Sequence, residues 1–193
     1  EVTPLSGQDK CEPCSRGKYH ASPGGALCSN CTAGKFANSV GSSACDLCAP
    51  GSASDKHGTL ECTKCQPGYF QPTPGSEQCI ACAAGRFLTM TGATECAVCP
   101  AGRYTATEGS TDCISCSPGN FNEIPGATGC SACAVGTFAN RSGAHKCSSC
   151  VPGQMASLQG QATCDLCPGG KYQSASGSSR CTACEAGSFA STP

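Results

Sequence analysis

The sequence predicts a small disulfide-rich repeat fold: an elongated, solenoid-like rod of 17-residue units, with short β-hairpin pieces and turns and almost no helix. Three observations lead to this prediction. Cysteine accounts for 22 of the 193 residues, a density typical of disulfide or metal scaffolds. The cysteines recur with a fixed period. Leu, Ile, Val and Phe together number only 21, and Trp is absent, so the chain lacks the side chains for a sizeable hydrophobic core.

The period is carried by Cys-x-x-Cys pairs at a constant 17-residue spacing, without insertion or deletion. The eleven pairs begin at Cys11, Cys28, Cys45, Cys62, Cys79, Cys96, Cys113, Cys130, Cys147, Cys164 and Cys181. Three residues after each pair comes a first glycine, from Gly17 to Gly187, and a second glycine recurs seven residues later, from Gly24 to Gly177. An aromatic column lies two residues after the first glycine, at Tyr19, Phe36, Phe70, Phe87, Tyr104, Phe121, Phe138, Tyr172 and Phe189. Only Ala53 and Met155 interrupt this column.

The two glycines predict two turns in each repeat. Proline precedes the first glycine at Pro50 and Pro118, and the second at Pro74 and Pro125. Pro-Gly suits the central positions of a type II turn, where the second residue needs a positive φ. Two turns in a 17-residue unit leave room only for short extended pieces and exclude a helix. Each repeat is therefore expected to be a small irregular hairpin, with its aromatic ring against a disulfide or the next repeat's backbone.

The organisation is that of one tandem array without separate domains. Residues 1–10 are a partial repeat, 11–184 hold the eleven Cys pairs, and 185–193 continue the last repeat. The chain thus looks like a fragment of a longer protein. Because a single unit is too small to bury a core alone, neighbouring units are expected to stack in one dimension, with contacts between nearest neighbours.

Disulfide bonds are the favoured role of the cysteines, and zinc is the main alternative. Two Cys-x-x-Cys knuckles with a 13-residue interval between them come close to the spacing of a zinc ribbon. Knuckles pair two by two, however, whereas the chain has eleven pairs, and every interval looks alike. A thioredoxin-like redox centre needs one pair at a helix start, which eleven copies without helices do not provide. Disulfides imply an oxidising compartment.

The equivalence of the repeats suggests which cysteines pair. The simplest scheme that treats every unit alike joins the second cysteine of one pair to the first of the next. The predicted bonds are Cys14–Cys28, Cys31–Cys45, Cys48–Cys62, Cys65–Cys79, Cys82–Cys96, Cys99–Cys113, Cys116–Cys130, Cys133–Cys147, Cys150–Cys164 and Cys167–Cys181. Cys11 and Cys184 would pair with repeats outside the fragment. A nested alternative joins equivalent cysteines of adjacent pairs and would distinguish odd from even units.

The unit resembles the ephrin-receptor-like cysteine-rich module. The signature reads C-D-L-C-A-P-G-S-A-S-D-K-H-G-T-L-E-C-T-K-C from Cys45 and C-A-V-C-P-A-G-R-Y-T-A-T-E-G-S-T-D-C-I-S-C from Cys96. It is more distantly similar to tumour-necrosis-factor-receptor and furin-like repeats. The resemblance implies an extracellular, non-catalytic role, and long arrays of this kind resemble those of large protist and algal surface proteins. The departures at Ala53 and Met155 affect local packing.

Charge and motif content exclude several function classes. The chain has 12 basic and 13 acidic residues, a net charge of −1, and no run of like charge. It therefore lacks the basic stripe expected of a nucleic-acid-binding protein. No apolar run approaches the length of a membrane span. No catalytic constellation, calcium loop or cofactor motif emerges, so we expect a protein that is not an enzyme and holds no metal or cofactor.

Two sequons predict N-glycosylation. Asn140-Arg141-Ser142 lies between the aromatic column and the second glycine, where a turn is expected to expose it. Asn30-Cys31-Thr32 lies inside a Cys pair, where disulfide formation competes with modification. The abundant Ser and Thr are candidates for O-linked sugar.

The sequence favours an extracellular structural protein: a disulfide-stapled spacer or a component of a surface filament or coat. Its expected partners are copies of itself or neighbouring filament subunits. The alternative is a ligand-binding receptor ectodomain or adhesin stalk at the cell surface. Single-ligand receptors usually need an irregular patch of distinctive loops, and the uniform repeat length favours the structural role.

Overall fold

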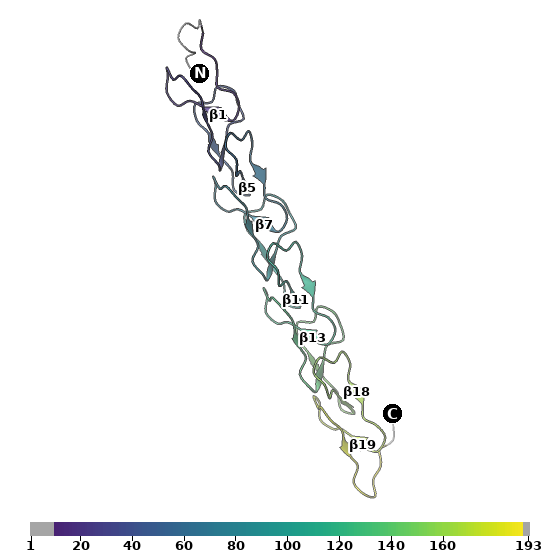
Figure 1. The fold of residues 1–193 in the computed structure, drawn as a ribbon. Coiled ribbons are helices and arrows are strands. Elements are labelled where there is room, and N and C mark those ends of the chain that lie inside the picture. Colours follow the sequence, from purple (N-terminus) through teal and green to yellow (C-terminus); the bar gives the residue numbers. More distant parts are fainter. Residues whose placement is uncertain (1–9, 191–193) are drawn as a thin grey trace. The chain divides into compact units, whose positions relative to one another are not determined.

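The structure, a computed structural model, describes residues 10–190 and confirms the disulfide-rich repeat fold. This part of the chain contains no helix, and its regular structure consists of two-residue β-strands. By contact, the chain divides into two compact units. Unit 1 comprises Glu1–Cys82 with Leu88–Ala97, and unit 2 comprises Ala83–Phe87 with Val98–Pro193. Both units are built of the same repeat, which we count from the first cysteine of one pair to the residue before the next pair (Figure 1).

Each hairpin uses two kinds of strand, set by position in the repeat. The first kind begins directly after the first glycine and ends at the aromatic column: β1 (Lys18–Tyr19), β3 (Lys35–Phe36), β5 (Ser52–Ala53), β7 (Tyr69–Phe70), β9 (Arg86–Phe87), β11 (Arg103–Tyr104), β13 (Asn120–Phe121), β15 (Thr137–Phe138), β17 (Gln154–Met155) and β19 (Lys171–Tyr172). The second kind consists of the two residues between the cysteines of a pair: β2 (Ser29–Asn30), β4 (Asp46–Leu47), β6 (Thr63–Lys64), β8 (Ile80–Ala81), β10 (Ala97–Val98), β12 (Ile114–Ser115), β14 (Ser131–Ala132), β16 (Ser148–Ser149), β18 (Asp165–Leu166) and β20 (Thr182–Ala183).

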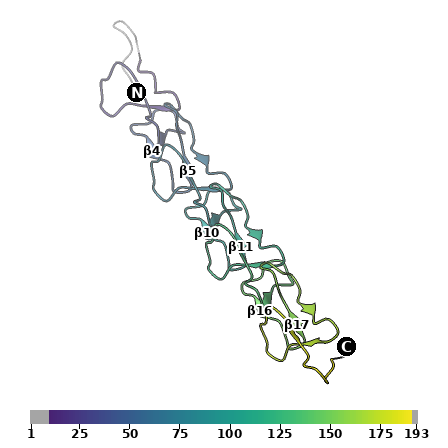
Figure 2. The same cartoon turned by 60° about the horizontal axis from the view of Figure 1, so that its bottom comes forward.

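Within each unit these strands form separate antiparallel pairs in chain order. Unit 1 contains β1–β2, β3–β4, β5–β6 and β7–β8, and unit 2 contains β11–β12, β13–β14, β15–β16, β17–β18 and β19–β20. The register is the same throughout: the aromatic position lies opposite the residue that follows the first cysteine of the next pair, as in Phe121 opposite Ser131. Figure 2 shows the recurring hairpins from a second direction.

Turns at both glycines end the strands, as the Pro-Gly steps predict. Gly51 has a φ of 80°, and the Ser52 N–H donates to the Ala49 carbonyl across it at 3.0 Å. With Pro50 before it, this is the geometry of a type II turn. The second glycine of the following repeat, Gly75, has a φ of 74°. The expected irregular hairpin is therefore confirmed.

The core differs in one respect from the sequence expectation. The largest fully buried side chains are those of the second cysteine of each pair, from Cys14 to Cys150. The aromatic column is half-buried through most of the chain, and Tyr172 and Phe189 are exposed. One aromatic ring does lie where predicted, because Phe70 packs against Cys82, Cys96 and Leu88.

A second buried column, which we call the inner column, follows the aromatic by one residue. It comprises Ala37, Ser54, Gln71, Leu88, Thr105, Asn122, Ala139 and Ala156, all 8 % exposed or less. The polar members are hydrogen-bonded, mostly within their own loop, although the Asn122 amide donates to the Arg103 carbonyl of the preceding repeat at 3.1 Å. The Gln71 amide donates to the Gln78 carbonyl at 2.7 Å, and the hydroxyls of Thr105 and Ser110 lie 2.6 Å apart. Because their hydrogen-bonding groups are satisfied, uncharged polar residues occur in this column as well as apolar ones.

Main-chain hydrogen bonds through the inner column connect successive repeats. The Gly119 N–H donates to the Ala139 carbonyl at 2.8 Å, and the Ala139 N–H donates to the Gln161 carbonyl at 3.3 Å. These three residues belong to three consecutive repeats. A repeat is thus held to its neighbours by backbone groups, which do not depend on side-chain identity.

The two glycine columns meet at close range two repeats apart. A Cβ built on Gly119 would overlap the carbonyl oxygen of Gly160, and the same overlap recurs between Gly34 and Gly75. Contacts therefore reach one repeat further than the nearest-neighbour scheme expected from the sequence. A first glycine in such a contact is required twice, for its positive φ and for the space that a side chain would occupy.

We predict that Gly119→Ala destabilises unit 2 by more than Gly153→Ala, and that Gly129→Ala has little effect. Gly119 has both a positive φ and the Gly160 carbonyl against it, Gly153 has a positive φ with nothing within 4 Å, and Gly129 has neither. Left-handed backbone alone costs about 1–2 kcal/mol for a residue with a Cβ. Urea unfolding of the oxidised variants measures the series, and equal losses for Gly119→Ala and Gly153→Ala would contradict the close packing.

The inner column generates a second prediction. Ala156→Asp should lower the free energy of unfolding by about 3 kcal/mol, because Ala156 is fully buried and an unpaired carboxylate there is desolvated. Ser157→Asp, one residue further on and exposed, is the matched control and should be near neutral. Hydrogen exchange should show the loss centred on residues 147–163, and similar effects of the two variants would rule out a buried column.

Candidate functional site: the disulfide ladder

The chemistry of this chain is concentrated in a ladder of ten disulfides. The bonds are Cys14–Cys28, Cys31–Cys45, Cys48–Cys62, Cys65–Cys79, Cys82–Cys96, Cys99–Cys113, Cys116–Cys130, Cys133–Cys147, Cys150–Cys164 and Cys167–Cys181. Each spans 14 residues, with α-carbons 5.6–5.8 Å apart. This is the consecutive ladder that the equivalence of the repeats predicts. None of the ten bonds follows the nested scheme.

The local structure of the Cys-x-x-Cys segment explains why its two cysteines bond in opposite directions. The two residues between them form a strand, as in β14 (Ser131–Ala132). Side chains alternate across an extended backbone, so residues three apart point to opposite faces. Cys130 therefore bonds back to Cys116 in the preceding repeat, and Cys133 bonds forward to Cys147.

The second cysteine of a pair is bonded to the repeats on both sides of it. The Cys133 N–H donates to the Gly119 carbonyl at 2.9 Å, and the Cys133 carbonyl accepts from the Gly160 N–H at 2.8 Å. Gly119 lies in the preceding repeat and Gly160 in the following one. Burial, covalent bonding and both main-chain groups thus tie one residue to the repeats on either side.

Bonded sulfurs are not the thiolates that zinc requires. Residues 10–190 contain no group of three or more His, Cys, Asp or Glu side chains placed to hold a metal ion. Cys11 and Cys184 carry no disulfide, Cys11 being exposed and Cys184 partly buried. Their pairing with cysteines outside the chain stays a prediction.

The repeat geometry agrees with a comparison against known families. A profile described as tyrosine-protein kinase ephrin type A/B receptor-like matches residues 51–96, 85–129 and 153–193. These ranges together cover more than half of the chain. The chain belongs to the ephrin-receptor-like family. No curated protein matches it.

Membership of the ephrin-receptor-like family, together with ten disulfides, indicates an extracellular module. Residues 10–190 include no helix long and apolar enough to cross a membrane. The three histidines, His20, His57 and His145, lie in separate repeats, and His57 and His145 are exposed. The Asp55-Lys56-His57 turn is exposed throughout.

Two features of these ephrin-receptor-like repeats escaped the sequence analysis. The inner column was missed because its residue types vary, but it contains no Asp, Glu, Lys or Arg in any repeat. That absence of charge is a signal of burial. The sequence explained the two glycine columns by turns alone. The close contact between glycines two repeats apart also requires glycine, because a Cβ would not fit there.

Both predicted glycosylation sites lie at the surface, and their modification stays a prediction. Asn140 and Asn30 are exposed. Asn30 lies in β2, and its carboxamide oxygen is 3.5 Å from the position of a Cβ on Gly58. A sugar at Asn30 would therefore have to pass the backbone of the next repeat, whereas Asn140 lies in an open loop.

We expect secreted protein to carry an N-glycan at Asn140 at higher occupancy than at Asn30. Folding closes the Cys31–Cys45 bond and brings Gly58 against Asn30, which hinders the transferase. Glycopeptide mass spectrometry measures both occupancies, with Ser142→Ala as the control that removes the Asn140 sequon. Higher occupancy at Asn30 would contradict this expectation.

Removing one ladder bond should loosen the chain locally. We predict that Cys116→Ala combined with Cys130→Ala lowers local stability by about 3 kcal/mol, the value of the chain-entropy model for a loop of this length. Hydrogen exchange should quicken between residues 116 and 130 and less in flanking repeats. Cys11→Ala, which removes a cysteine without a disulfide, should change nothing, and equal effects of the two variants would contradict the ladder.

Proposed function

We propose that this chain is an extracellular structural array, a disulfide-stapled spacer or a subunit of a surface filament or coat, with no catalytic activity. The observation that carries the proposal is the ladder itself, in which every repeat is bonded covalently to the next. Such a chain transmits force along its length without relying on a hydrophobic core.

The ladder limits how far each repeat can stretch. When the disulfides are intact and the chain is pulled from its ends, the force passes through each repeat only by the disulfide and the three-residue step from the first to the second cysteine of a pair. Three extended residues span about 10 Å, and the bonded α-carbons are 5.6–5.8 Å apart. An oxidised repeat therefore extends to about 16 Å, whereas a reduced 17-residue repeat reaches about 60 Å. Resistance to extension is a useful property for a spacer or a fibre.

The uniform surface supports assembly with like copies. The same backbone geometry recurs in every 17-residue repeat within each unit, and the loops between strands carry mostly Ser, Thr, Ala and Gly. A weak contact repeated at many equivalent points gains through multivalency. A net charge of −1 leaves little repulsion between parallel copies. Neighbouring copies of the chain are therefore the proposed partners, with glycans on the outer loops.

The mechanical part of the proposal predicts a response to reduction. Pulled from its two ends, the oxidised chain should give no long extension steps, and reduction should add about 40 Å of contour for each disulfide opened. Single-molecule force spectroscopy measures both states. The Cys116→Ala, Cys130→Ala double variant should show one such increment before reduction, and long steps in the intact oxidised chain would contradict the load path.

The structural role itself is tested by imaging the native protein. Electron microscopy of material released from its surface should show continuous filaments or a coat, and sedimentation of the purified chain should show reversible self-association. Isolated molecules that bind one saturable soluble ligand would overturn the proposal in favour of a receptor or adhesin stalk.

A further inference from the structure

The two departures from the repeat pattern within residues 45–79 line one pocket. Ala53 takes a place in the aromatic column, and Tyr69 brings an aromatic ring to a position that is otherwise polar. The residues at the Tyr69 position in the other described repeats are Lys18, Lys35, Ser52, Arg86, Arg103, Asn120, Thr137, Gln154, Lys171 and Ser188. Although they belong to different repeats, Ala53 and Tyr69 line the same pocket.

The repeat shows what normally occupies this place. One repeat further on, Phe70 packs against the Cys82–Cys96 disulfide together with Leu88 and Ala93. Ala53 stands one full repeat before Phe70, and the equivalent disulfide is Cys65–Cys79. A methyl group thus replaces a phenyl ring over a disulfide, and the ring's space is left open.

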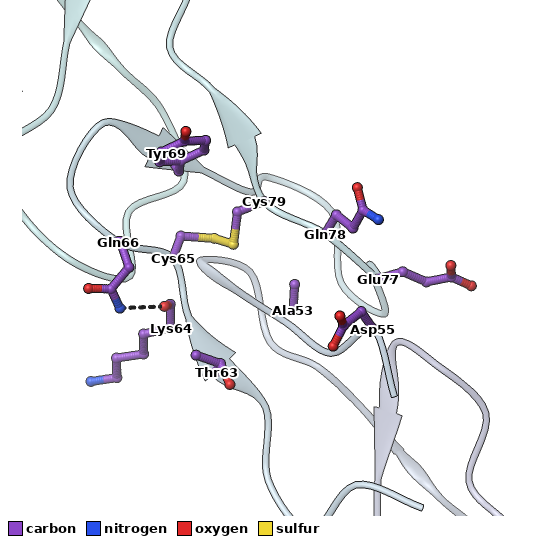
Figure 3. Close-up of a pocket in the computed structure, with 10 residues that line it drawn as sticks. All are labelled: Ala53, Asp55, Thr63, Lys64, Cys65, Gln66, Tyr69, Glu77, Gln78 and Cys79. Carbon is purple, nitrogen blue, oxygen red and sulfur yellow. Dashed lines mark hydrogen bonds between the residues drawn. A yellow bond between two sulfur atoms is a disulfide. The ribbon is translucent and has the colours of Figure 1, made fainter. Parts of the chain in front are cut away.

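The result is an open pocket of about 410 Å³. Ala53, itself 6 % exposed, and the Cys65–Cys79 disulfide lie at its centre, with the Tyr69 ring on one side (Figure 3). Tyr69 is 42 % exposed, so that its ring is available to a ligand. The floor is therefore apolar and the wall aromatic.

Two carboxylates make one rim of the pocket acidic. Asp55 and Glu77 both lie on the side of Ala53 away from Lys64, whose ammonium group extends outward (Figure 3). Within residues 10–190, neither carboxylate takes part in an ion pair. Glu77 is also the only acidic residue at its position of the repeat in this part of the chain.

We propose that this pocket binds an aromatic side chain of a partner polypeptide, flanked in that partner by a Lys or Arg. The ring lies on the Cys65–Cys79 disulfide and Ala53, in the place that Phe70 takes one repeat later, and packs against Tyr69. The adjacent basic group approaches Asp55 and Glu77, where opposite charge favours it. This site is independent of the structural role, because a spacer and a receptor can both carry one docking point.

The second interruption of the aromatic column supplies a matched control. Met155 occupies the equivalent place in unit 2, is half-buried, and keeps a long apolar side chain there. Lys171 stands at the Tyr69 equivalent and Ser179 at the Glu77 equivalent. An aromatic wall and an acidic rim therefore accompany only the Ala53 interruption.

The test uses the fluorescence of a tryptophan probe, because the chain contains no Trp. The full oxidised chain is titrated against N-acetyl-Trp-Arg-amide. We expect saturable binding that weakens at least about tenfold with N-acetyl-Trp-Glu-amide and is not competed by N-acetyl-Ala-Arg-amide. Ala53→Phe, which restores the column, should reduce binding at least about tenfold, whereas Met155→Phe should leave it unchanged.

A second variant keeps the proposal falsifiable if Ala53→Phe fails to form its ten disulfides. Tyr69→Lys installs the residue found at the equivalent positions 18, 35 and 171 and should weaken binding at least about fivefold. Binding that survives both variants, or that is equal for the Arg and Glu probes, overturns the proposal. Binding of N,N′-diacetylchitobiose that is lost on Ala53→Phe, with no binding of the tryptophan probe, would also overturn it and assign the pocket to a sugar.

Discussion

The covalent closure of a 14-residue segment between consecutive Cys pairs is the constraint on which the rest of this structure depends. Strands of two residues and a half-buried aromatic column could not by themselves offset the conformational entropy of so glycine-rich a chain. Each disulfide restricts the unfolded ensemble instead. It also fixes where the buried second cysteine lies, and the backbone hydrogen bonds of Cys133 to Gly119 and Gly160 depend on that placement.

Close backbone contact accounts for the unvarying period. The first glycine of one repeat meets the second glycine two repeats later, as Gly119 meets Gly160, with no room for a Cβ. An inserted or deleted residue would move one glycine column relative to the other and break several such contacts at once. The inner column connects repeats through its main chain rather than its side chains, which explains why Ser54, Gln71 and Leu88 can occupy the same buried position.

The ephrin-receptor-like array combines repeats of one geometry with a place, at positions 53 and 69, where the residue pattern changes. Identical covalent links in successive repeats suit the proposed structural role, because each link would bear load in the same way. Recognition of a partner requires a place that differs from its neighbours. Ala53, where other repeats have an aromatic residue, and Tyr69, where they have a polar one, make such a place. The Cys65–Cys79 disulfide is at once a link of the ladder and part of the floor of the pocket.

The spacing of cysteines and glycines by itself determined the repeat, the turns, the absence of helix and the pairing of the ladder. Period and turn chemistry act locally, and equivalent repeats admit few pairing schemes. Only the tertiary structure decided which columns are buried. Burial of Ala156 and the half-burial of Phe138 depend on where the next repeats lie. The position of Ala53 and Tyr69 on the lining of one pocket likewise depends on that placement. The path of the backbone, rather than a residue's own side chain, sets which later repeat lies beside it.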